Sequence, residues 1–76
     1  MTMTITRTKM TNNIYLSYAQ LLTYANQLLG AGVAYLRKVT GRCFLRLLDG
    51  RKFIFHYNEM NMLTHIYFAN TCYTRM

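Results

Sequence analysis

The sequence predicts an α+β fold in a single small domain, residues 1–76: an N-terminal helix, a three-stranded antiparallel β-meander and a C-terminal helix. Three observations predict this fold. Apolar residues at helical spacing occupy the first third of the chain and recur near its end. Between them lie alternating apolar and polar runs punctuated by Thr40-Gly41 and Asp49-Gly50. Seventy-six residues suffice for one domain, but only with a thin core.

Residues 1–9 alternate threonine with Met, Ile, Arg and Lys. A period of two with Thr and Ile is typical of a short strand, so an N-terminal edge strand is predicted. A frayed tail fits the same residues, because chain ends become ordered only when they pair.

The first helix is predicted to follow Thr11-Asn12-Asn13, whose side chains can accept hydrogen bonds from free helical N–H groups. Apolar residues then recur at helical spacing from Ile14 to Leu29. Gly30 and Gly32 follow, and glycine ends helices by entering the left-handed conformation without a Cβ clash.

The meander is predicted from three β-rich runs: Val33–Val39, Arg42–Leu48 and Arg51–Tyr57. Thr40-Gly41 joins the first two, and this turn pairs Leu36 with Leu45 and Arg37 with Phe44. Asp49-Gly50 joins the last two. Asp-Gly between alternating runs is the strongest short-range signal for a two-residue hairpin turn.

A two-residue turn at Asp49-Gly50 fixes the side-chain faces of this hairpin. It predicts the pairs Leu48/Arg51, Leu47/Lys52, Arg46/Phe53, Leu45/Ile54, Phe44/Phe55, Cys43/His56 and Arg42/Tyr57. One face then collects Arg42, Phe44, Arg46, Arg51, Phe53, Phe55 and Tyr57. Both helices are predicted to cover the other face, at Leu36, Leu45, Leu47 and Ile54.

The last helix is predicted to begin at Asn58-Glu59, where Asn caps and Glu complements the helix dipole. Its apolar stripe would comprise Met62, Leu63, Ile66, Ala69 and Tyr73. No proline interrupts the chain.

The charge is strongly unbalanced, with nine Lys and Arg residues against Asp49 and Glu59, a net charge of +7. Such a surface attracts nucleic acid, acidic protein surfaces or anionic lipid. Net charge also keeps a small apolar chain dispersed, which is the simpler explanation. Because 53% of the residues are hydrophobic, more than a thin core needs, we expect an exposed apolar surface.

No catalytic residue, metal site or cofactor is predicted, so we expect a protein that is not an enzyme. Both carboxylates are used by a turn and a helix start, and no glycine-rich phosphate loop is present. The spacing of Cys43, His56, His65 and Cys72 matches no zinc pattern. Two cysteines make no disulfide framework, and without a leader or a membrane-spanning apolar run we expect a cytoplasmic protein.

A partner-binding face is predicted where arginines alternate with aromatic rings. Its residues are Tyr35, Arg37, Arg42, Phe44, Arg46, Arg51, Phe53, Phe55 and Tyr57. Guanidinium groups bind phosphate and rings stack on bases, but tyrosine and arginine are also enriched at protein–protein hot spots. The alternative is that the three phenylalanines form the core beneath the helices.

Two functions therefore stay open. The first is an inhibitor or regulator of a protein partner whose surface is acidic or handles nucleic acid; the second is direct nucleic-acid binding through the same face. A homodimer would use these residues too. Membrane binding is not predicted, because the first helix carries no Lys or Arg. The short, basic, proline-free composition is similar to that of accessory and inhibitor proteins of phages and plasmids.

Replacing Leu45 with Asp is expected to unfold the domain, because an unpaired buried charge costs several kcal/mol, much of the stability of a small domain. Thermal melting followed by circular dichroism measures this effect. A variant that melts like the parent would show that Leu45 is not in the core.

Overall fold

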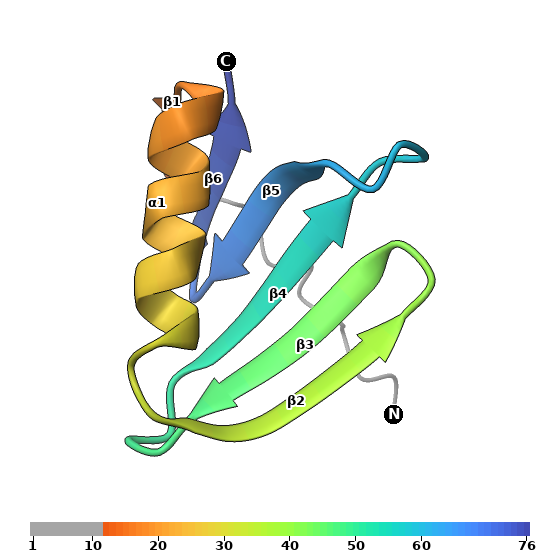
Figure 1. Ribbon diagram of the computed structural model, residues 1–76. Helices are drawn as coiled ribbons and strands as arrows, with labels where there is room; N and C mark the ends of the chain where they lie inside the picture. Colours follow the sequence, from red (N-terminus) through yellow and green to blue (C-terminus); the bar gives the residue numbers. More distant parts are fainter. Residues whose placement is uncertain (1–11) are drawn as a thin grey trace, which may run out of the picture.

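The computed structural model describes residues 12–76, which form one helix and six strands in a single mixed sheet (Figure 1). The predicted meander flanked by two helices is therefore wrong. The elements are β1 (Asn12–Leu16), α1 (Tyr18–Leu29), β2 (Val33–Val39), β3 (Arg42–Leu47), β4 (Lys52–Tyr57), β5 (Leu63–Phe68) and β6 (Thr71–Arg75). The strand expected over residues 1–9 lies outside the described residues.

The strands lie in the order β1-β6-β5-β4-β3-β2. Strands β2 to β6 form an antiparallel meander, and β1 joins its far edge parallel to β6. Helix α1 connects the two edges of the sheet and packs over β1, β5 and β6 (Figure 1). The helix thus covers one side of the sheet, and no helix or strand of residues 12–76 covers the other side.

The predicted helix start is wrong, because the chain forms strand β1 before α1 begins. Ser17 caps the helix: its hydroxyl accepts from the Gln20 amide at 3.2 Å, and the Gln20 side chain accepts from the Ser17 amide at 3.0 Å. This reciprocal capping box starts the helix at Tyr18. Asn12–Leu16 is left free to pair with β6.

The predicted C-terminal helix is also wrong, since that region forms the β5–β6 hairpin. Asn58 does accept from backbone N–H groups, but they belong to Met60 and Met62 in the loop before β5. The side chain therefore shapes a turn instead of capping a helix. The β-branched and aromatic residues of β5 favour a strand. Ala69 then adopts a φ of +55° in the turn to β6.

The register of the β3–β4 hairpin differs by one residue from the prediction, because its turn has three residues instead of two. The Leu47 amide donates to the Arg51 carbonyl at 2.9 Å, and the Gly50 amide donates to the Leu47 carbonyl at 3.0 Å. Gly50 has a φ of +95°, so the loop is a tight turn followed by a left-handed glycine. The observed pairs are Arg42/His56, Cys43/Phe55, Phe44/Ile54, Leu45/Phe53 and Arg46/Lys52.

The core lies between α1 and the covered side of the sheet. Its residues are Leu21, Ala25 and Leu28 of the helix with Cys43, Leu45, Leu47, Phe53, Phe55, Leu63 and Ile66 of the strands. Tyr24 and Tyr73 pack at 4.8 Å between ring centroids and hold the helix against β6. Two residues expected in the core are not there. Ile54 points to the other side of the sheet, opposite Phe44, and Leu36 faces the covered side but is 44% exposed.

The register predicts that shortening two neighbouring side chains of β4 lowers the free energy of unfolding by different amounts. Phe55→Ala is expected to lower the free energy of unfolding by about 3–5 kcal/mol, because Phe55 is completely buried. Ile54→Ala should cost clearly less, since Ile54 is only half-buried on the other side. Urea denaturation of both variants measures this difference, and a larger loss for Ile54→Ala would support the two-residue turn instead.

Candidate functional site

The candidate site is the side of the sheet that α1 does not cover, which we call the open face. Successive side chains of a strand point to opposite sides of a sheet. The pairing that places one set of side chains in the core therefore places the alternate set on the open face. Over β2 to β5 the open face comprises Tyr35, Arg37 and Val39 of β2, Arg42, Phe44 and Arg46 of β3, Lys52, Ile54 and His56 of β4, and His65 and Tyr67 of β5. Within residues 12–76, no helix or strand packs on it.

Five of the nine predicted binding residues lie together on this face: Tyr35, Arg37, Arg42, Phe44 and Arg46. The structure separates the other four from them. Phe53 and Phe55 are 2% and 0% exposed in the core, and Tyr57 is half-buried against it. Arg51 lies beside the β3–β4 turn, opposite Leu47 on the covered side.

The two hypotheses for the phenylalanines each hold for part of the set. Phe53 and Phe55 form the core beneath the helix, whereas Phe44 remains half-buried on the open face. Tyr35 and Val39 are exposed apolar residues of the open face, whereas the most exposed large apolar side chains, Leu48, Met60 and Met76, lie in loops and at the C-terminus.

Two cationic side chains face one another directly across the strands of the open face, since Arg46 lies opposite Lys52. Arg42 is a third cation of this face and lies opposite the imidazole of His56. Like charges at directly opposed positions destabilise a sheet, and an anion bound between them would relieve this repulsion. The open face therefore carries a local excess of positive charge that an anionic ligand would neutralise.

Neither side-chain carboxylate of the chain compensates this charge. Asp49 accepts from the Arg51 side chain at 2.7 Å and from its backbone amide at 3.0 Å in the turn. These contacts, the backbone hydrogen bond foremost, lower the pKa of Asp49 below its usual 3.8. Glu59 lies in the loop between β4 and β5. The charge of the open face is thus left without an acidic neighbour in its own strands.

His56, His65 and Tyr67 form a cluster of rings at one end of the open face. The centroid distances are 4.8 Å from His56 to Tyr67 and 6.1 Å from His56 to His65. Burial lowers the pKa of His56 below its usual 6.5, and the nearby charges of Arg42 and His65 lower it further. A bound anion would act in the opposite direction and favour the charged imidazole.

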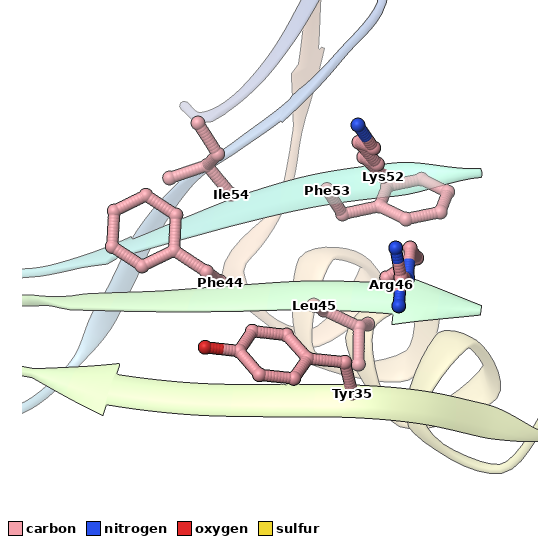
Figure 2. A pocket seen from close by; sticks show the side chains of 7 residues that line it. All are labelled: Tyr35, Phe44, Leu45, Arg46, Lys52, Phe53 and Ile54. Atoms are coloured by element: carbon pink, nitrogen blue, oxygen red, sulfur yellow. The ribbon is translucent and has the colours of Figure 1, made fainter. Parts of the chain in front are cut away.

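Two shallow hollows mark the open face. The first, of about 400 Å³, is lined by Tyr35, Phe44 and Ile54, with Arg46 and Lys52 at one end. Figure 2 shows these side chains on the near side of the strands, with α1 behind them. The second, of about 420 Å³, shares Lys52 and Ile54 with the first and continues past His56 and Tyr67 to Ala69. Together they form an apolar trough across the sheet, with Arg46 and Lys52 beside it.

The sequence interpretation missed five residues of this face: Lys52, Ile54, His56, His65 and Tyr67. The first three alternate with Phe53 and Phe55, so allowing a three-residue turn would have placed them correctly. His65 and Tyr67 were assigned to a helix, although Leu63–Phe68 is rich in β-branched and aromatic residues.

The described residues give little support for a metal site, a membrane-spanning helix or a reactive cysteine. No group of three metal-ligating side chains occurs between residues 12 and 76, and no helix there is long and apolar enough to cross a bilayer. Cys43 and His56, predicted to pair across the strands, lie on opposite sides of the sheet. Cys43 and Cys72 are both buried free thiols, and Cys72 lies in β6 instead of the expected helix.

No protein-family model, curated protein or solved structure matches the chain. The function is therefore inferred from the chemistry of the open face itself.

The lowered pKa of His56 predicts that acid weakens the fold. The unfolded chain binds a proton at this imidazole more readily than the folded protein does, so stability rises with pH in this range. The contribution is complete above the usual pKa of 6.5 and is lost as the pH falls from there towards the folded-state pKa. Urea midpoints at about pH 7.5 and about pH 5 measure the loss.

His56→Asn should remove this part of the pH dependence, because the amide does not titrate. Asp49, whose pKa is lowered from 3.8, contributes only at still more acidic pH. An identical loss in the wild type and in His56→Asn would contradict the account.

Proposed function

We propose that the protein is a non-catalytic interaction protein that binds an anionic macromolecule through the open face. The observation that carries this proposal is the cluster of Arg42, Arg46 and Lys52 on one face, with Arg46 directly opposite Lys52 and no acidic residue in these strands. An anionic group bound between them would relieve the repulsion of these cations.

Shape supports the same conclusion. The trough beside Arg46 and Lys52 is shallow, broad and lined by Tyr35, Phe44 and Ile54, which suits an extended partner better than an enclosed small molecule. Arginine and tyrosine at its rim are residue types that contribute most to binding at macromolecular interfaces.

The anionic partner belongs to one of two classes. An acidic or nucleic-acid-handling protein would be inhibited or regulated by the open face, as accessory proteins of phages and plasmids act. A nucleic acid would be bound directly. In either case we propose that the protein acts in the cytoplasm, without cofactor or metal.

The double variant Arg42→Gln/Arg46→Gln tests the proposal. Immobilised wild-type protein should retain anionic material from a lysate of its own cells and release it at raised salt, because screening weakens such contacts. The variant should retain far less, while its melting temperature stays within a few degrees of the wild type.

A matched control separates the open face from net charge. Lys38→Gln/Arg75→Gln also removes two positive charges, but Lys38 lies on the covered side of the sheet and the Arg75 guanidinium lies over the Tyr18 ring of α1. The control should retain as much as the wild type. Nuclease treatment distinguishes the two classes of partner, and equal retention by both double variants would exclude the open face as the site.

A further inference from the structure

We propose that the open face binds single-stranded nucleic acid, with bases stacked against Tyr35 and Phe44 and phosphates held by Arg46 and Lys52. This inference rests on the proposed function and names its ligand class.

The rings and cations of one hollow come from three neighbouring strands. Tyr35 lies opposite Arg46, and Arg46 lies opposite Lys52, so a ring and two cations form one row across β2, β3 and β4. Phe44 lies two residues from Arg46 along β3 and so points to the same side. Figure 2 shows both rings and both cations bordering this hollow.

The rings are accessible for stacking. Tyr35 is 47% exposed, and Phe44 is half-buried beside it without a stacked aromatic partner among the described residues. By contrast, Phe53 already stacks on Phe68 at 4.5 Å in the covered core. Planar rings left free beside cations suit a ligand that alternates flat bases with anionic groups.

The trough continues beyond this first hollow. Phe44 lies opposite Ile54, and Ile54 lies opposite Tyr67, so the three residues form one row across β3, β4 and β5. The Phe44 and Tyr67 side chains are therefore two strand spacings, about 10 Å, apart. A single strand crossing the sheet would thus pass from Phe44 over Ile54 to His56 and Tyr67. A duplex hides the faces of its bases and would leave these rings unused.

An acidic protein surface would satisfy the cations but has no repeating flat rings for the trough. The test therefore compares three anionic probes on the wild-type protein: an oligothymidylate, an abasic deoxyribose-phosphate strand of the same length, and an oligoglutamate of equal charge. Fluorescence anisotropy at low salt gives the dissociation constant of each.

Oligothymidylate is expected to bind about tenfold or more tightly than the abasic strand, because each stacked base adds affinity independently of charge. Phe44→Leu and Tyr35→Leu should each weaken oligothymidylate binding about tenfold and leave the abasic strand unchanged. Leu36→Ala, an exposed apolar change on the other side of β2, serves as the control and should have no effect.

Three results would overturn the inference. Equal affinity for oligothymidylate and the abasic strand would show that bases are not stacked, although the open face still binds anions. Tighter binding of oligoglutamate would assign an acidic protein as the partner. Binding of none of the three probes would remove the proposed function as well. The wild-type comparison stands even if Phe44→Leu fails to fold.

Discussion

The structure depends on the three-residue turn Leu48-Asp49-Gly50. Gly50 adopts a positive φ, and Asp49 accepts hydrogen bonds from Arg51 that close the loop. The Leu48 amide also donates to the Gly32 carbonyl at 2.9 Å, which ties the turn to the segment after α1. Together these contacts set the register of β3 against β4, and a shift of one residue would send every β4 side chain to the opposite side.

This register separates apolar bulk from charge. It places Phe53 and Phe55 opposite Leu45 and Cys43, where the helix buries all four. The alternate positions of the same two strands then carry cations on the open face. A register that mixed the two sets would bury Lys52 without a partner, which costs several kcal/mol. The core and the candidate binding surface are therefore consequences of one turn.

Local signals in the sequence predicted the local structure. Thr40-Gly41 pairs Leu36 with Leu45 and Arg37 with Phe44, and the structure confirms both pairs. The predicted register of β3 against β4 was wrong, because Asp-Gly occurs in both two- and three-residue turns. Five of the nine predicted binding residues depend only on β2 and β3, and these five share the open face.

The rest of the fold depends on contacts that no short window of sequence reveals. Leu63, Ile66 and Tyr73 fit a helical stripe, but short apolar runs fit helices and strands alike, and pairing with β4 decides for strands. Likewise, β1 pairs with β6 from the opposite end of the described chain. Its residues lie where a helix was expected, and only the distant partner makes them a strand.

Nuclear Overhauser effects between backbone protons test the register most directly. Because Leu47 donates to Arg51, the ladder alternates so that Phe44 and Ile54 form a pair without mutual hydrogen bonds, with Cα atoms about 4.5 Å apart. The account predicts a strong Hα–Hα contact between Phe44 and Ile54. A strong Hα–Hα contact between Leu45 and Ile54 or between Phe44 and Phe55 would contradict it.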